Sequence, residues 1–145
     1  MANAVAADLA RARRKTAVAV GIGNFMEWFD FAVYGFFATT LGRVFFPSES
    51  AAVSLLSSLA VFGVAFFMRP LGGFVRGSLG DRKGRRWTLT MTVGLMGVAT
   101  TLVGLLPTYA QVGVLAPVLL VLLRCLQGFS AGAEWTGSSA FLIEY

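Results

Sequence analysis

The chain has 145 residues, of which 57% are hydrophobic and 13% are charged, and its mean hydropathy is +0.74. A water-soluble domain of this length needs more polar surface, so we expect an integral membrane protein. A single cysteine excludes an internal disulfide, and there is no histidine, the commonest general base and metal ligand. Any proton chemistry must therefore use carboxylates, and neither a metal site nor a cofactor is expected.

The positive charges are placed as membrane topology requires. Four basic residues lie between positions 11 and 15 and five between 76 and 86, which together are nine of the twelve in the chain. Each group adjoins a long apolar stretch, which indicates a cytoplasmic flank of a membrane span and not a nucleic-acid footprint. We therefore expect both termini in the cytoplasm, membrane lipid as a partner, and no nucleic acid.

An apolar stretch at residues 16–41 follows the first basic group, and residues 1–15 are predicted to form a cytoplasmic tail. The apolar region of a signal peptide is only about 7–15 residues long, so this stretch is predicted to be an uncleaved first span. Four polar or acidic side chains share one face of it at about 100° per residue. They are Asn24, Glu27, Asp30 and Tyr34.

The two acidic residues of this span require an explanation, because an ionised side chain near the bilayer centre costs at least ~2.5–3.5 kcal/mol. Glu27 and Asp30 should therefore face protein or a water-filled cavity, as part of a substrate and proton pathway. The alternative is that they only pair with basic residues on neighbouring helices, and the two roles are compatible.

A second span is predicted at residues 51–76, after a short outer loop in which Pro47 and Ser48 are typical of a helix start. Pro70 should kink or locally open this span, and Arg69 places a charge directly before the proline. A tight, glycine-punctuated polar connection follows. It contains Gly77, Gly80, Asp81, Arg82, Lys83, Gly84, Arg85 and Arg86.

This connection resembles the signature G-x-L-a-D-r-x-G-r-r, which joins the second and third helices of major facilitator superfamily transporters. Lys83 departs from the signature, because an aromatic or aliphatic residue is more usual there. The resemblance implies a cytoplasmic gate, in which Asp81 contacts helix ends of the opposite half of the transporter. Arg85 and Glu144 resemble the rest of that charge cluster.

Third and fourth spans are predicted at residues 87–106 and 116–143, joined by a short outer turn. The fourth carries Arg124, Gln127 and Glu134, and its run R-x-x-Q-G-x-x-x-G resembles a second signature of the superfamily. Three further segments, at 23–38, 69–73 and 133–137, resemble the metabolite:proton symporter branch of the superfamily. Members of that branch transport proline and betaine, 2-oxoglutarate, citrate or shikimate.

Depth along the spans predicts which charges can pair. At about 1.5 Å per residue, Arg124 lies near the midplane with Glu27 and Asp30, so one of these carboxylates should be its partner. Arg69 and Glu134 lie at similar distances from the cytoplasmic side and should pair with each other. One acid is then left without a base, and a buried unpaired acid favours its protonated form. A proton-coupled carrier needs such a residue.

The fold predicted is an all-α integral membrane protein with four transmembrane helices, which the resemblance equates with helices 1–4 of a twelve-helix fold. Residues 16–145 would then be part of the N-terminal domain of a secondary transporter in the bacterial inner membrane. It would carry a small carboxylate or zwitterionic metabolite with protons, and would need the remainder of the transporter. The alternative is a free-standing four-span protein that oligomerises as a small pump or scaffold. An enzyme is not expected, since the sequence has no phosphate loop and no nucleophile–base pair.

Overall fold

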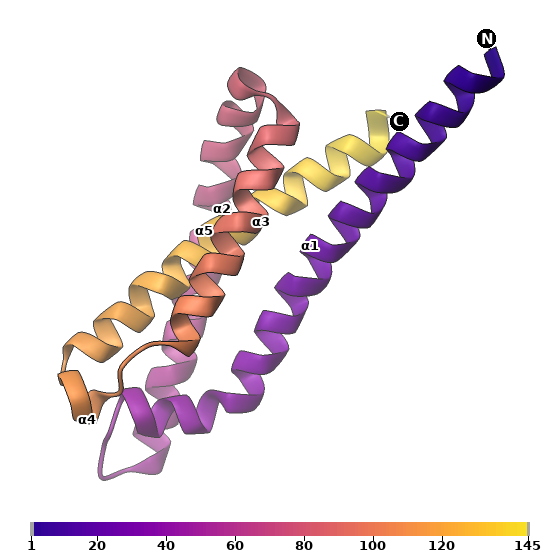
Figure 1. Cartoon of the computed structure of the whole chain (residues 1–145). Helices are drawn as coiled ribbons and strands as arrows, with labels where there is room; N and C mark the ends of the chain where they lie inside the picture. Colours follow the sequence, from indigo (N-terminus) through magenta and orange to yellow (C-terminus); the bar gives the residue numbers. More distant parts are fainter. Residues whose placement is uncertain (1, 145) are drawn as a thin grey trace.

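The computed structural model describes the backbone of residues 2–144, and within it the side chains at 11, 14, 17–18, 21–75, 78–80, 82–84, 87–88 and 90–132. This part of the chain is helical and contains no strand (Figure 1). Four long helices are joined by short connections, with a fifth, one-turn helix in the last of them. They are α1 (Ala2–Phe45), α2 (Ala51–Lys83), α3 (Arg85–Gly104), α4 (Tyr109–Val112) and α5 (Leu115–Glu144).

The helices extend beyond the predicted spans on the side where the two basic groups lie. Helix α1 begins at Ala2, so the predicted tail is helical, and α2 continues through Pro70 to Lys83 without a break. The predicted polar loop therefore shrinks to Gly84 alone, whose φ of 93° is one that residues with a side chain rarely adopt. Arginine and lysine are good helix formers, so a charged segment leaving the membrane can remain helical.

The connections at the opposite end also differ from the predictions. Helix α2 begins at Ala51, where the second span was predicted to begin, but its N-cap is Ser50 and not the suggested start at Pro47 and Ser48. Ser54 Oγ donates to the carbonyl of Phe46 at 2.7 Å and ties α2 to the preceding loop. The predicted outer turn contains α4, which a capping box between Thr108 and Gln111 stabilises.

Helices α2 and α5 pack closely because glycine faces backbone at three points. A Cβ atom on Gly128 would overlap the backbone of Ala65, and one on Gly132 would overlap the backbone of Arg69. Gly72 of α2 lies equally close to the backbone of α5 at Phe129. Helices in lipid associate through close contacts of this kind between small residues, because the apolar lipid provides no hydrophobic driving force for their association.

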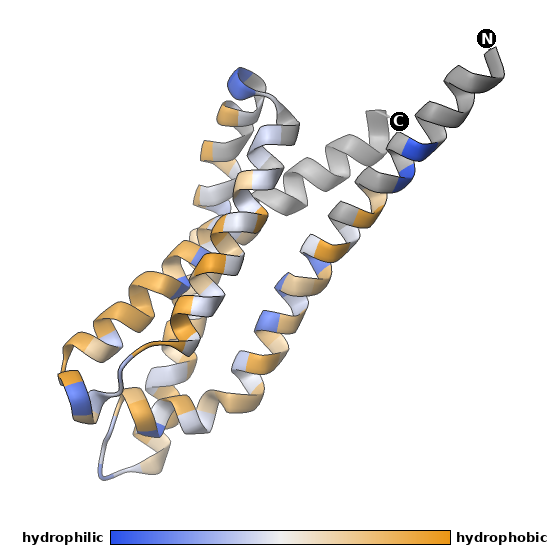
Figure 2. Cartoon of the chain, viewed as in Figure 1, coloured by the Kyte–Doolittle hydropathy of each residue, from blue (hydrophilic) through white to orange (hydrophobic). Residues whose placement is uncertain are grey.

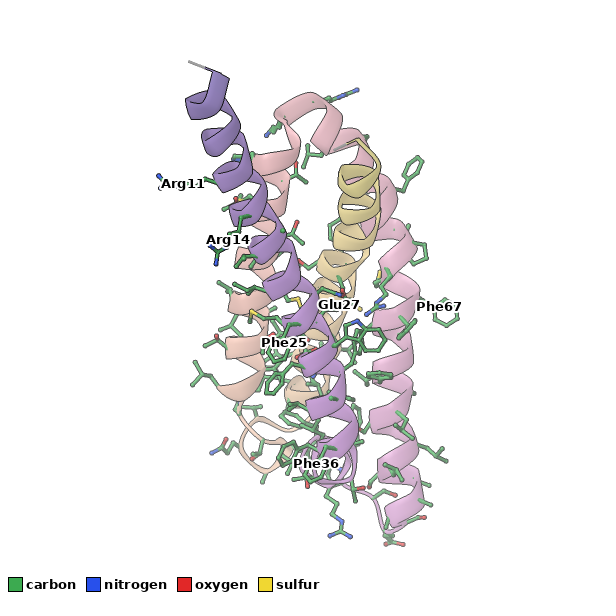
Figure 3. The ribbon with its side chains drawn as sticks, turned by 90° about the vertical axis from the view of Figure 1, so that its right-hand side faces the viewer. Arg11, Arg14, Phe25, Glu27, Phe36 and Phe67 are labelled. Carbon is green, nitrogen blue, oxygen red and sulfur yellow. The ribbon has the colours of Figure 1, made fainter. Side chains whose placement is uncertain are left out.

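Apolar residues occur along the length of the described helices (Figure 2), and many large apolar side chains are exposed. Phe36, Phe67 and Phe74 are each more than 80% exposed, and Phe67 points away from the helices (Figure 3). Two helical segments of the described chain, Ala51–Gly80 and Leu115–Gly132, are long and apolar enough to cross a membrane, and Thr90–Gly104 is a shorter apolar helix. The fold is thus that of a helical membrane protein, while the count of four spans stays a prediction.

We expect Gly128→Ala to destabilise the bundle, because the added methyl group meets the α2 backbone and not a movable side chain. Overpacking of this kind typically costs about 1–3 kcal/mol. The measurement is thermal unfolding in detergent, followed by tryptophan fluorescence. Gly94→Ala on α3 is the matched control, since its Cβ would meet nothing within 4 Å. Equal unfolding temperatures for the two variants would contradict the packing role of Gly128.

Topology gives a second prediction. The α1–α2 connection and α4 lie at one end of the bundle, and the α2–α3 turn lies at the other (Figure 1). Because the basic groups should stay in the cytoplasm, single cysteines at positions 48 and 110 should be labelled from outside the cell. A cysteine at position 83 should not be labelled, in a background without Cys125. The reverse pattern would show that the orientation is wrong.

Candidate functional site

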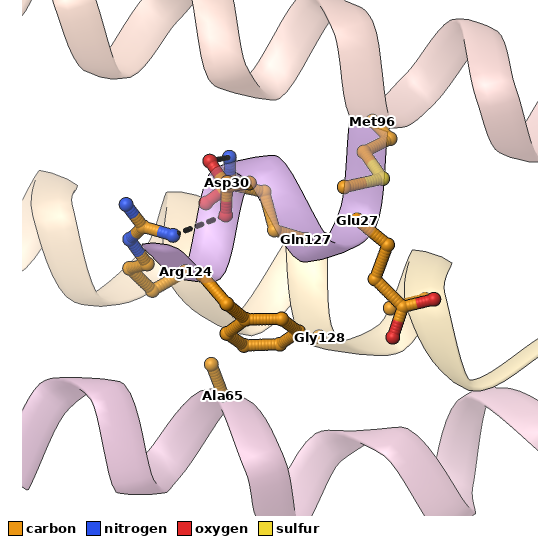
Figure 4. A pocket seen from close by; sticks show the side chains of 9 residues that line it. Glu27, Asp30, Ala65, Met96, Arg124, Gln127 and Gly128 are labelled. Atoms are coloured by element: carbon orange, nitrogen blue, oxygen red, sulfur yellow. Dashed lines mark hydrogen bonds and ion pairs between the residues drawn. The ribbon is translucent and has the colours of Figure 1, made fainter. Parts of the chain in front are cut away.

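Two carboxylates of α1 are buried against arginines from two other helices. Asp30 pairs with Arg124 of α5, with Oδ2 and Nη1 2.5 Å apart (Figure 4), and Glu27 pairs with Arg69 of α2. Glu27 is only 2% exposed and Arg124 only 4%. The spacing of three residues places both acids on the same face of α1, so one face makes both ion pairs.

The Asp30–Arg124 pair is the centre of a hydrogen-bond network that joins all four long helices. Gln127 Nε2 donates to Asp30 Oδ1 at 3.3 Å and to Thr100 Oγ1 of α3 at 2.8 Å. The Arg124 guanidinium lies 3.9 Å from the centre of the Tyr34 ring. The Tyr34 hydroxyl in turn donates to the carbonyl of Ser58 in α2 at 2.9 Å. The predicted pairing of Arg124 with an acid of the first span is confirmed, and the acid is Asp30.

The second ion pair lies in an aromatic setting. The Arg69 guanidinium is 4.2 Å from the centre of the Phe31 ring and 4.4 Å from that of Phe66. Arginine stacked on aromatic rings gains about 0.5–2 kcal/mol from the π electrons. The ring faces therefore help to hold a guanidinium that is largely removed from water.

Depth counting did not predict that Arg69 pairs with Glu27, and the predicted pairing of Arg69 with Glu134 stays a prediction. The counted depths of Arg69 and Glu27 differ by two or three residues, which is about 3–5 Å at 1.5 Å per residue. The long arginine side chain spans that offset. The side chain of Glu134 lies outside the described residues.

A small cavity separates the two ion pairs. Its volume is about 10 Å³, which is close to the space that one water molecule requires. Both acids, Arg124 and Gln127 line it, together with apolar residues from all four long helices. The full lining is Glu27, Asp30, Phe31, Ala65, Met96, Arg124, Gln127, Gly128 and Ala131.

Four buried polar atoms at this site have no hydrogen-bond partner within the described part of the chain. Two are acceptors, Glu27 Oε2 and Gln127 Oε1, and two are the Nε donors of Arg69 and Arg124. A buried polar atom without a partner costs about 1–3 kcal/mol, so such atoms are rare in structural networks. Three of the four belong to residues that line the cavity, which is typical of a site that binds something further.

The remaining described residues that were predicted to be functional do not line the cavity. Asn24 is exposed and does not line the cavity, although it was expected on the same face as Glu27. Arg82 is exposed beside Gly84 at the α2–α3 turn, and Gly80 accepts the Gly84 N–H through its carbonyl. The other gate positions lie outside the residues whose side chains are described. They are Gly77, Asp81, Arg85, Arg86 and Glu144.

Sequence reasoning missed the partners that complete the network. Thr100 and Met96 belong to a span that carries no charge, and Ser58 contributes a backbone carbonyl. The one available signal was spacing, since Met96 and Thr100 are four residues apart and share a helix face.

Comparison with known proteins identifies the family of the chain. Residues 15–145 match the family described as sugar (and other) transporters. The chain belongs to this family, and with it to the major facilitator superfamily. The match favours a transporter over a free-standing four-span protein or an enzyme.

The individual relatives that match the chain are also transporters. The chain is 50% identical over 132 residues to the proline/betaine transporter of Salmonella typhimurium and 48% identical to that of Escherichia coli. It is 49% identical to the glycine betaine/proline/ectoine/pipecolic acid transporter of Dickeya dadantii. These alignments cover 91% of this chain and 26% of each relative, so the chain spans about a quarter of their length. No solved structure matches the chain.

We expect Asp30→Asn to destabilise the chain strongly, because it leaves the Arg124 guanidinium buried without a counter-charge. Breaking a buried ion pair from one side typically costs about 3–5 kcal/mol, whereas replacing both partners is much milder. The double variant Asp30→Asn with Arg124→Gln should therefore recover most of the lost stability, as measured by chemical unfolding in detergent. Glu49→Gln removes an exposed acid and serves as the control. A double variant no more stable than Asp30→Asn would contradict the pairing.

Proposed function

We propose that this chain supplies the first four helices of a proton-coupled symporter for a small zwitterionic solute that carries a carboxylate. The observation that carries the proposal is the buried Asp30–Arg124 pair beside a cavity with unpartnered polar atoms. The related transporters are named for proline and betaine, and this supports a solute of this chemistry. The bacterial inner membrane, with both termini in the cytoplasm, is the location that we propose.

Arg124 is the residue that we assign to the solute carboxylate. Arginine is charged at every physiological pH and offers a planar, forked set of donors that matches a carboxylate. Its Nη1 is engaged by Asp30, while its Nε has no partner among the described residues. A solute carboxylate arriving in the cavity would therefore compete with Asp30 for this guanidinium.

Competition of this kind couples the solute to a proton. Among the described residues, two acids and two arginines form the site, and their four charges cancel when it is empty. A solute carboxylate would add one negative charge in a medium where an uncompensated charge is expensive. A proton taken up by an α1 carboxylate restores neutrality, so solute and proton enter together.

The polar turn between α2 and α3 is assigned to gating. Its motif resembles the family's cytoplasmic signature, and we propose that Asp81, Arg85 and Glu144 form the charge cluster of the gate. Asp81→Asn should then impair transport while expression stays near normal.

The test is a chimera in which residues 14–145 replace the matching quarter of the Salmonella proline/betaine transporter. It should restore proline and betaine uptake in cells lacking their own carriers, and Arg124→Ala should reduce that uptake at least 100-fold. The expected loss reflects a charge-assisted, bidentate contact worth about 3 kcal/mol. Arg43→Ala is the control, because Arg43 is exposed at the outer end of α1. If the Arg124→Ala chimera still accumulates solute against its gradient, Arg124 is a structural charge and the proposal fails.

A further inference from the structure

The two α1 carboxylates differ in how many of their oxygen atoms are engaged. Asp30 uses both, Oδ2 toward Arg124 and Oδ1 toward Gln127. Glu27 uses Oε1 toward Arg69, while its Oε2 is buried and has no partner within the described residues. The residue pattern alone does not distinguish these acids, but their surroundings do.

An unpartnered Oε2 is the atom at which a proton is most useful. A protonated carboxyl group has an O–H donor, whereas an ionised carboxylate only accepts hydrogen bonds. Gln127 Oε1 is a second buried acceptor without a partner, and it lines the same cavity as Glu27. One proton on Glu27 would therefore satisfy two atoms through the single water for which the cavity has room.

We propose that Glu27, and not Asp30, takes up the proton, and that Gln127 accepts the hydrogen bond of the protonated carboxyl group through one bridging water. This assignment rests on the proposed function for its role in transport, but the proton site itself is defined without a solute. In the step, hydronium from the aqueous phase gives up its proton, an O–H bond forms at Glu27 Oε2, and water is released. Release of the proton to the other side reverses the same step.

The charged groups around Glu27 fit this role. Arg69 of α2 holds Oε1, Asp30 lies one turn further along α1, and Arg124 of α5 lines the other side of the cavity. Among the described lining residues, α3 contributes only Met96, which does not ionise. Glu27 in Figure 4 points away from the Asp30–Arg124 pair, so a proton can be added without displacing that pair.

Gln127 links the proton site to the solute site. Its amide nitrogen donates to Asp30 and its amide oxygen is left for Glu27. When a solute carboxylate displaces Asp30 from Arg124, the Gln127 side chain loses one of its anchors. The nitrogen of the Gln127 amide would thus respond to the solute through Asp30, and its oxygen would respond to the proton on Glu27.

The experiment is pH-difference infrared spectroscopy on the 145-residue chain in lipid nanodiscs, with no solute present. The spectrum at low pH minus that at high pH should contain a carboxylic acid C=O band that Glu27→Gln removes. The double variant Asp30→Asn with Arg124→Gln, which removes that ion pair without leaving a buried charge, is the matched control and should retain the band, and Glu27→Asp should keep it at a shifted frequency. Circular dichroism confirms that each variant is folded. Loss of the band in the double variant instead, or a band equally present in Glu27→Gln, would overturn the assignment.

A second measurement tests Gln127 and remains informative if Glu27→Gln does not fold. Gln127→Met keeps the side-chain length but removes the acceptor, so the C=O band should move to higher frequency as a hydrogen bond is lost. Thr100→Val, which removes only the other partner of the Gln127 nitrogen, should leave the band in place. An unchanged band in Gln127→Met would overturn the assigned hydrogen bond. The readout uses no transport, so a chimera that fails to take up proline would refute the proposed function without affecting the proton site.

Discussion

The requirement that buried charge be neutralised governs the arrangement of this bundle. Helix α1 contributes both carboxylates, and α2 and α5 contribute one arginine each. An isolated charge near the bilayer centre costs at least ~2.5–3.5 kcal/mol, so in the empty site each arginine lies against an acid. Because the acids are three residues apart on α1, the two pairs together fix both the rotation of α1 and its height relative to α2 and α5.

Glycine contacts between α2 and α5 make this geometry attainable. Gly132 lies against the backbone of Arg69, whose side chain turns toward Glu27. Gly128 lies against Ala65 one turn away, and both of these residues line the cavity. A larger residue at either glycine would push the helices apart and lengthen the reach from each arginine to α1. Packing and electrostatics are therefore properties of the same few residues.

The sequence predicted most of the architecture and half of the site. Apolar runs and basic flanks indicated the long helices, and depth alone paired Arg124 with an acid of the first span. Helix ends were less predictable, since a charged segment such as 77–83 stays helical once it has left the apolar stretch. The Arg69–Glu27 pair was missed because depth counting ignores side-chain length and helix rotation. The roles of Thr100 and Ser58 depend on three-dimensional neighbours, which no linear spacing defines.

The aromatic rings explain how such a site can exchange one carboxylate for another. Each guanidinium lies over ring faces, Arg124 on Tyr34 and Arg69 between Phe31 and Phe66. These contacts are worth about 0.5–2 kcal/mol, enough to keep an arginine in position but less than a buried ion pair requires. An arginine held by its ring stays in place when its own acid leaves, yet still needs an anion. In the proposed function, replacing an internal carboxylate by that of a solute would leave the number of ion pairs unchanged, and the proton taken up with the solute would offset the added negative charge. The exchange would then run in both directions, as an alternating carrier requires.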